Sequence, residues 1–287
     1  MTLRFHWRLP ALREAPDVET HLAVCRQAEE YGIESVLLPL DLADPEPFAW
    51  AAALGRRTER IRFIVGIRTG VSSPTYWTQQ VNTLAAILGG RVAVQIATDW
   101  HPAEQPRYGD SITPEDWYGR ADEFWQVCLG LWRGTEAVSL AGRHYTIDDA
   151  KINMHFVSGN GRDRPEIYVE GDNAAAAELA IRRADCLLTR ATSPEQLADH
   201  IQPVLAAGVE AGLTATLPAW VAASAGSASA DDFAQAILGY REVGVTQFVF
   251  AGGPSRPCLD WLRCFGQDVM PRVRAREASP ALPGHGR

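Results

Sequence analysis

The run Ile61-Arg62-Phe63-Ile64-Val65-Gly66-Ile67 decides the fold class, because it is apolar apart from Arg62. A strand with one face in water alternates apolar and polar residues. A parallel strand that helices cover on both faces is apolar almost throughout. We therefore predict a buried parallel strand over this run, in a protein of the α/β class.

Strand-like runs of this kind alternate with helical runs along the whole chain. The expected strands are Arg4–Leu9, Ser35–Pro39, Ile61–Arg68, Arg91–Thr98, Glu166–Glu170, Asp185–Thr189, Leu217–Ala223 and Thr246–Ala251. The expected helices are Val18–Tyr31, Glu46–Thr58, Thr75–Leu88, Arg120–Leu131, Ala174–Arg183, Pro194–Ala211, Ser229–Val243 and Pro257–Val269. Eight such units predict a (β/α)8 barrel of the TIM type, which typically needs about 250 residues. A doubly wound sheet is the alternative, but no Gly-x-Gly-x-x-Gly follows the first strand.

The domain organisation follows from this repeat. We expect residues 1–270 to form a single barrel domain and residues 271–287 to be a disordered tail. Two stretches fit no repeat unit: a loop at 99–117 and an excursion at 138–164, which reads as a small hairpin and loop.

Composition and charge exclude several classes of protein. The chain has 27 basic and 35 acidic residues, a net charge of −8, whereas a nucleic-acid-binding protein normally carries a basic face. No apolar run approaches the roughly 18–20 residues of a membrane span, and the first residues lack the pattern of a signal peptide. Five cysteines without a Cys-x-x-Cys motif indicate reduced thiols, so we expect a cytoplasmic protein.

The segment Thr98-Asp99-Trp100-His101-Pro102 holds the first candidate site residues, because chemistry in this fold lies at the C-terminal ends of the strands. Asp99 and His101 are candidates for an acid–base pair in which the carboxylate orients the imidazole. The alternative is that both side chains cap a solvated loop. A single Asp-x-His without a second ligand cluster does not indicate a metal site.

Arg68 and two tryptophans are further candidates near strand ends. Arg68 ends an otherwise apolar strand, so its guanidinium either contacts an anion or cofactor or forms a salt bridge, for example with Asp41 or Asp44. Trp7 and Trp100 are the candidates for walls of a substrate cavity.

The segment Glu170-Gly171-Asp172-Asn173 precedes the fifth helix of the repeat. The backbone N–H groups at such a helix start can bind a phosphate. Asp172 is also a good N-cap residue and would then supply the negative charge from within the protein. From the residues alone, a structural cap is the favoured interpretation.

A series of motifs extends over the chain: Arg68-Thr69-Gly70-Val71-Ser72-Ser73-Pro74-Thr75, Gln79-Gln80-x-x-Thr83-Leu84, Gly90-Arg91, Thr98, Pro102, Glu104, Trp117-Tyr118-Gly119-Arg120-Ala121-Asp122-Glu123-Phe124, Leu131-Trp132, Gly142-Arg143, Gly171, Glu178-Leu179-Ala180 and Gly244-Val245-Thr246-Gln247-Phe248-Val249. With these motifs the sequence resembles the luciferase-like flavin monooxygenases, nearest to the alkanesulfonate monooxygenase branch, in a shortened form without the lid insertion. The resemblance covers nearly the whole chain and is most specific between Arg68 and Phe124.

The resemblance implies a bacterial-luciferase-like barrel that accepts reduced FMN from a separate flavin reductase. Oxygen would add to the flavin to form a peroxyflavin, which oxidises a small substrate. The resemblance places Arg68 and Thr98 near the isoalloxazine ring and Tyr118 near the phosphate. It also places Gly171, Asp172 and Asn173 in the phosphate loop. It further implies a homo-oligomer.

Departures from the family pattern argue against an alkanesulfonate as the substrate. The family's Gly-Gly-Ser-Ser-like phosphate loop is Glu170-Gly171-Asp172-Asn173 here, and Asp172 brings a like charge to an incoming phosphate. The sulfonate branch's Tyr-Pro-His is Gly253-Pro254-Ser255, and its Trp after the sixth strand is Arg190. Arg190 either holds a substrate carboxylate or phosphate or pairs with Asp172 or Glu170. We therefore expect a small polar metabolite, in a specialised bacterial biosynthetic pathway.

Three alternatives remain open at this point. In the first, the barrel has lost flavin and uses Asp99, His101 and Arg190 in acid–base or binding roles. In the second, the protein is a dehydrogenase that uses a deazaflavin. In the third, the protein binds flavin without catalysing a reaction. Glu170 and Asp172 argue against a deazaflavin, because its extended phosphate tail needs basic residues.

Overall fold

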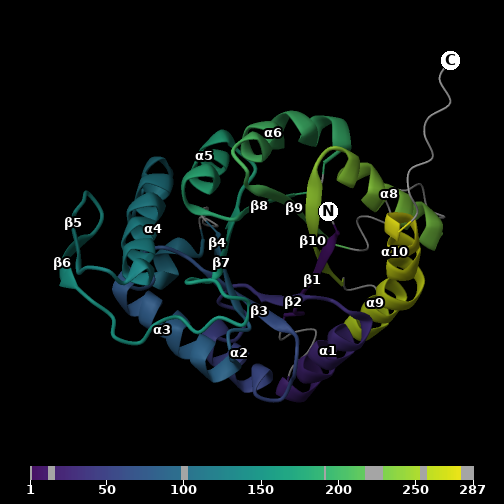
Figure 1. The fold of residues 1–287 in the computed structure, drawn as a ribbon, viewed down its shortest axis with the longest axis horizontal. Helices are drawn as coiled ribbons and strands as arrows, with labels where there is room; N and C mark the ends of the chain where they lie inside the picture. Colours follow the sequence, from purple (N-terminus) through teal and green to yellow (C-terminus); the bar gives the residue numbers. More distant parts are fainter. Residues whose placement is uncertain are drawn as a thin grey trace.

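The barrel predicted from the repeat is confirmed. In the computed structural model, residues 2–11, 17–97, 103–190, 192–216, 229–252 and 257–278 are described. Eight parallel strands close into a barrel in the order β1-β2-β3-β4-β7-β8-β9-β10, with β10 paired to β1. Figure 1 shows the strands enclosed by a ring of helices.

The elements alternate as strand and helix around this ring. The strands are β1 (Arg4–Arg8), β2 (Ser35–Leu38), β3 (Arg62–Ile67), β4 (Val92–Ala97), β5 (Val138–Ala141), β6 (Thr146–Ala150), β7 (Glu166–Glu170), β8 (Cys186–Arg190), β9 (Glu210–Thr216) and β10 (Val245–Ala251). The α-helices are α1 (Val18–Tyr31), α2 (Pro47–Gly55), α3 (Pro74–Leu88), α4 (Trp117–Arg133), α5 (Ala174–Arg183), α6 (Pro194–Ala206), α8 (Ala230–Glu242), α9 (Cys258–Cys264) and α10 (Met270–Ala278). Shorter helical turns are η1 (Gln105–Tyr108), η2 (Pro114–Asp116) and the π-helical turn η3 (Phe265–Val269).

Serine side chains cap the starts of α3 and α6. Ser73 accepts a hydrogen bond from the backbone of Tyr76 at the start of α3, and Ser193 does the same at α6. In both helices a proline follows the cap, where its missing N–H costs nothing.

Two separate cores hold the barrel together. Residues that face outward from the strands, such as Phe5 and Trp7, pack against the helices in one large cluster. Residues that face inward form a second cluster that fills the interior, made of Leu37, Ile64, Ala93, Tyr168, Cys186, Leu188 and Val249. The barrel is therefore a packed body rather than a pore, and a ligand site has to lie at one of its ends.

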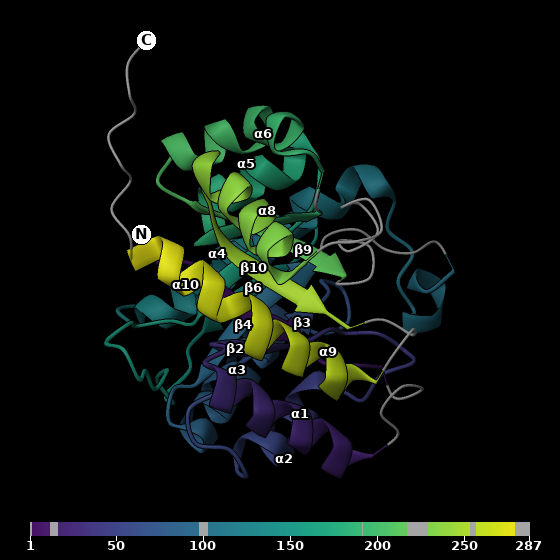
Figure 2. The same ribbon diagram turned by 90° about the vertical axis from the view of Figure 1, so that its right-hand side faces the viewer.

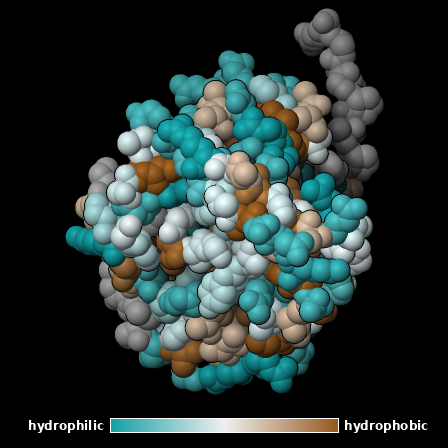
Figure 3. Space-filling view, turned by 90° about the vertical axis from the view of Figure 1, so that its left-hand side faces the viewer, coloured by the Kyte–Doolittle hydropathy of each residue, from teal (hydrophilic) through white to brown (hydrophobic). Residues whose placement is uncertain are grey.

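β5 and β6 form an antiparallel pair outside the barrel, within residues 138–164. Figure 1 shows this pair next to α4. Figure 3 shows that the side carrying α3, α4 and this pair presents apolar residues scattered among hydrophilic ones.

The seventh barrel strand corrects one expectation. The strand is β9, at Glu210–Thr216, whereas we expected it at residues 217–223, which lie outside the described residues; α6 ends at Ala206 rather than at Ala211. The reason lies in the barrel interior, where a Cβ on Gly212 would lie 2.6 Å from the Leu188 side chain. Packing against β8 selects the small residue, so the run lacks the apolar signal of a buried strand.

The C-terminal segment corrects a second expectation, since residues 271–278 belong to α10 and are not a disordered tail. Met270 and Val273 are buried, and Glu277 accepts a hydrogen bond of 2.7 Å from the backbone N–H of Leu3. These contacts stabilise α10 on the barrel beside the start of β1. Residues 279–287 lie outside the described residues.

Within the described residues, no helix combines the length and the apolar character that crossing a membrane requires.

Candidate active site

The C-terminal ends of the barrel strands carry the candidate site, as expected for this fold. Figure 2 shows the arrowheads of β9 and β10 pointing toward one side of the molecule. Two adjoining pockets open at this end. They share five lining residues, Leu40, Asp41, Gly66, Ile67 and Arg68.

The first pocket lies over the barrel interior and is called the mouth pocket here. Its volume is about 210 Å³, and it is lined by Arg8, Pro39, Leu40, Asp41, Gly66, Ile67, Arg68, Gln95, Ala97 and Glu170. Gln95 is buried, and its amide donates a hydrogen bond to the Glu170 carboxylate. Arg8 is exposed and makes no ion pair with any described residue. The mouth pocket thus presents a fixed amide–carboxylate pair and guanidinium groups.

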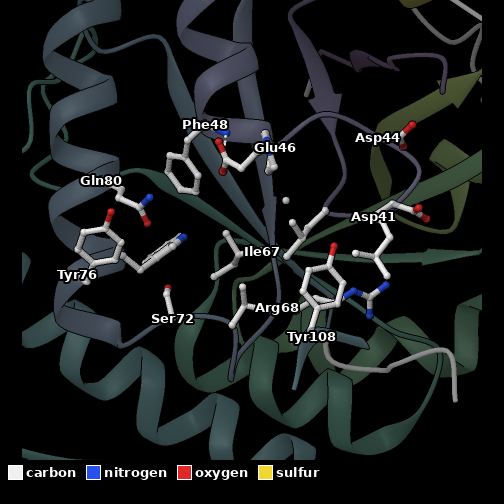
Figure 4. Close-up of a pocket in the computed structure, with 16 residues that line it drawn as sticks. Asp41, Asp44, Glu46, Phe48, Ile67, Arg68, Ser72, Tyr76, Gln80 and Tyr108 are labelled. Atoms are coloured by element: carbon white, nitrogen blue, oxygen red, sulfur yellow. Dashed lines mark hydrogen bonds between the residues drawn. The ribbon is translucent and has the colours of Figure 1, made fainter. Parts of the chain in front are cut away.

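The second pocket extends outward from the mouth and is called the side pocket. Its volume is about 380 Å³, and it is lined by Leu40, Asp41, Leu42, Asp44, Glu46, Pro47, Phe48, Gly66, Ile67, Arg68, Val71, Ser72, Tyr76, Trp77, Gln80 and Tyr108. Figure 4 shows Phe48, Tyr76 and Gln80 at one end and Asp41, Asp44, Arg68 and Tyr108 at the other. Most of its wall is apolar or aromatic, with a few polar groups, which is the usual make-up of a small-molecule site.

Gly66 forms part of the floor of both pockets. A Cβ at this position would lie 2.8 Å from the carbonyl oxygen of Leu38 and 2.9 Å from the Cα of Pro39. Only glycine lets the segment after β2 approach β3 this closely. The conformation of that segment sets the position of Asp41.

A buried ion pair anchors the segment that carries Tyr108. The Arg120 guanidinium binds both carboxylate oxygens of Asp110 at 2.7 Å and also donates to the backbone carbonyl of Thr69 at 2.8 Å. The loop after β3 and the segment before α4 are thereby joined. Tyr108 lies on that segment beside the side pocket, where burial and the negative charge of Asp41 raise its pKa.

The predicted phosphate loop contains an internally compensated carboxylate. Asp172 accepts hydrogen bonds from the Thr189 hydroxyl at 2.7 Å and from the Arg190 backbone N–H at 2.8 Å, and the Arg190 guanidinium forms an ion pair with it. Burial favours a raised pKa for Asp172, but these hydrogen bonds and the Arg190 charge lower its pKa below the usual value. Asp172 is therefore ionised, and Arg190 compensates its charge.

Asn173, and not Asp172, caps α5, which corrects the expectation for this helix. The Asn173 Oδ1 accepts from the backbone N–H of Ala176 at 2.9 Å, because both Asp172 oxygens are engaged by β8. The Asn173 amide also donates to the Tyr118 hydroxyl at 2.8 Å. Tyr118 on α4 is thus joined to the start of α5, two regions that the resemblance assigned to one phosphate site.

The structure treats the other predicted site residues differently. Arg68 lines both pockets. Trp7, expected as a cavity wall, is fully buried on the outer side of β1 against Phe265, since the alternation of strand side chains turns Arg8 inward instead. Thr98, Asp99, Trp100 and His101 lie outside the described residues.

The sequence analysis named Asp41 as a possible salt-bridge partner of Arg68 and did not identify the aromatic wall of Phe48, Tyr76 and Trp77. For Arg8, the alternation of inward and outward side chains along β1 was the sequence signal that could have placed it at the barrel mouth. No comparable signal existed for the aromatic wall, because its residues lie on two different helices. The described residues contain no group of three or more His, Cys, Asp or Glu side chains placed to hold a metal ion.

Comparisons with known proteins place this geometry in a family. A family model for luciferase-like monooxygenases matches residues 3–271. EDTA monooxygenase from Chelativorans sp. BNC1 has a similar structure, with a TM-score of 0.81 and 17% identity over 98% of this chain and 95% of that chain. An F420-dependent secondary alcohol dehydrogenase is also similar, with a TM-score of 0.77 and 18% identity over 96% of this chain and 100% of that chain. DmoA from Hyphomicrobium sulfonivorans has a TM-score of 0.76 and 14% identity over 99% of this chain and 90% of that chain.

At these identities the structural likeness shows the fold, and the family match carries the assignment. The match spans nearly the whole chain, from the first barrel strand into α10. The resemblance seen in the sequence is therefore confirmed, and the chain is an enzyme of the luciferase-like monooxygenase family.

Proposed function

We propose that the protein is a reduced-flavin-dependent monooxygenase that receives FMN in its reduced form from a separate reductase and oxidises a small organic molecule at the mouth pocket. The observation that carries the proposal is the pairing of Asp172 with Arg190. Because Arg190 compensates the negative charge of Asp172, that charge no longer argues against a phosphate beside the start of α5.

The residues around this pair fit a phosphate group. The Tyr118 hydroxyl accepts a hydrogen bond from the Asn173 amide and can donate its own proton to a ligand, and the Arg190 guanidinium, which pairs with Asp172 next to Asn173, is 77% exposed. The start of α5 adds backbone N–H groups and the positive end of the helix dipole. These groups would hold the phosphate of FMN.

The barrel mouth fits the reacting part of the cofactor and the substrate. When bound, reduced flavin supplies the two electrons with which molecular oxygen gives one atom to the substrate and the other to water. The Gln95–Glu170 pair and the guanidinium of Arg68 orient polar groups at the mouth. The packed interior residues beneath it, such as Tyr168 and Leu188, exclude water from below.

The proposal is tested by titrating the purified protein with oxidised FMN and, anaerobically, with reduced FMN, followed by calorimetry. We expect micromolar binding that is stronger for the reduced form, and oxygen-dependent product formation when a flavin reductase is added. Failure to bind either form would contradict the proposal. Riboflavin serves as the control ligand, because it lacks the phosphate and should bind more weakly than FMN.

A deazaflavin-dependent dehydrogenase is the second candidate function. Two solved structures of similar fold are described as F420-dependent, one a secondary alcohol dehydrogenase and one a tetrahydromethanopterin reductase. The compensation of Asp172 by Arg190 weakens the electrostatic argument against this cofactor as well. Binding of reduced F420 in preference to reduced FMN, in the same calorimetric titration, would favour the dehydrogenase.

A further inference from the structure

We propose that the side pocket binds the organic substrate as a cation, namely an amine with an apolar or aromatic body, and that the amino group lies at the end next to the mouth pocket. This inference rests on the proposed function, because it names the substrate class of the same barrel mouth. It is carried by the charges and the apolar wall of the side pocket.

The charged residues of the side pocket favour a cation. Asp41, Asp44 and Glu46 line it, against a single guanidinium from Arg68. The Glu46 carboxylate is engaged as the N-cap of α2, where it accepts from the backbone of Phe48 and Ala49. At the end away from Phe48 and Tyr76, the carboxylates that line the side pocket are those of Asp41 and Asp44.

Asp41 is the carboxylate best placed to receive the cation. It is half-buried, lines both pockets, and accepts a 2.7 Å hydrogen bond from the backbone N–H of Ala43. Within the described residues it forms no ion pair, in contrast to Asp172, Asp185 and Asp110, each of which binds an arginine. A partly buried carboxylate gains from an opposite charge, and a bound ammonium group supplies one.

The other end of the pocket favours an apolar or aromatic body. Phe48 and Trp77 meet edge to face with ring centroids 6.5 Å apart, and Tyr76 lies on the same helix as Trp77. Aromatic faces bury apolar groups and attract organic cations. Figure 4 shows Phe48 and Tyr76 at the end opposite Asp41, so a bound amine is oriented with its ring toward them.

The shared residues fix which end of the substrate meets the cofactor. Asp41, Ile67 and Arg68 belong to both pockets, whereas Phe48, Tyr76 and Gln80 belong to the side pocket alone. An amine bound at Asp41 therefore presents its nitrogen and the adjoining carbon to the mouth pocket. The apolar body stays remote from it.

The test measures binding to the protein without flavin, so its outcome is independent of oxidation chemistry. Three probes of similar size are used in calorimetry: 2-phenylethylamine, 2-phenylethanol and 3-phenylpropionate. We expect the amine to bind about tenfold more tightly than the alcohol, as expected for one hydrogen bond to a charged group, and the carboxylate to bind most weakly.

Two substitutions and a control identify the residues responsible. Asp41→Asn should weaken binding of the amine about tenfold and leave the alcohol unchanged, whereas Phe48→Leu should weaken both probes alike. Glu136→Gln, at an exposed carboxylate that does not line either pocket, is the matched control and should change nothing. Thermal unfolding of each variant verifies that it is folded.

Equal or tighter binding of 3-phenylpropionate would overturn the proposal, as would an Asp41→Asn variant that keeps the preference for the amine. Absence of binding by all three probes would overturn it as well. None of these results bears on the affinity for reduced FMN, so a failure here is distinct from a failure of the monooxygenase assignment.

Discussion

The two ends of the barrel carry arginine and glutamate on the same two strands, β1 and β7, but these residues make different contacts at the two ends. On β1, Arg4 and Arg8 both point inward and are four residues apart. Arg4 binds Glu166 and Glu34 at 2.6 Å each, whereas Arg8 is exposed and makes no ion pair with the described residues. β7 carries Glu166 at its start, in ion pairs with Arg4 and Arg62, and Glu170 at its end, where Glu170 accepts a hydrogen bond from the Gln95 amide at the mouth pocket.

This difference separates charges that are paired with one another within the fold from charges that line a pocket. At the N-terminal end, Arg4, Arg62, Glu34 and Glu166 form a closed network of ion pairs. At the C-terminal end, the Arg8, Arg68 and Asp41 side chains line open pockets. Stability at the first end and chemistry at the second is the division of labour known for this fold.

The largest effect is expected at the closed end. Glu166→Gln leaves Arg4 and Arg62 without their shared carboxylate, whose side chain is only 7% exposed. Removing one partner of a buried ion pair typically costs about 3–5 kcal/mol of stability. Chemical unfolding measures this loss. Glu170→Gln is the matched variant at the open end and should cost about 1 kcal/mol or less. Equal losses for the two variants would break the comparison.

The barrel interior also predicts a pH dependence of stability. Burial lowers the pKa of His6 to about 4, so the folded protein keeps this imidazole neutral while the unfolded chain takes up a proton below its usual pKa of 6.5. The free energy of unfolding should therefore fall as the pH decreases from 6.5 to 4, by about 3 kcal/mol. A His6→Gln variant should show a much shallower dependence over that range. An unchanged slope in the variant would show that other groups are responsible.

How far the sequence predicts this molecule depends on what selects each residue. The strand β3 is predictable because its burial requires a continuous apolar run, and the caps of α3 and α6 are predictable because their chemistry is local. The strand β9 is not, since packing of Leu188 from the neighbouring strand selects Gly212. The compensation of Asp172 by Arg190 joins residues on two strand ends, and only the three-dimensional register brings them together.

An intermediate effect is expected when the Asp172–Arg190 pair, beside the proposed phosphate site, is broken. Arg190→Gln leaves the Asp172 charge uncompensated beside the start of α5, so the affinity for FMN should fall about tenfold, corresponding to the loss of one charged hydrogen bond. The affinity for riboflavin should be unchanged, because riboflavin has no phosphate to repel. Calorimetry of both ligands with both proteins measures the difference. A parallel loss for riboflavin would place Arg190 elsewhere in the site.

The smallest effect on stability is expected for Arg8, and it sharpens the contrast with Arg4 on the same strand. Arg8→Gln removes an exposed guanidinium with no ion pair to a described residue, so the free energy of unfolding should change by no more than about 0.5 kcal/mol. Since Arg8 lines the mouth pocket, the same variant should change ligand affinity there while its unfolding curve overlays that of the parent. Arg133→Gln, at an exposed arginine near the end of α4, is the control that should alter neither quantity. If Arg8→Gln destabilised the protein as strongly as Glu166→Gln, the charge at the open end would belong to the fold, and the separation of the two ends would be wrong.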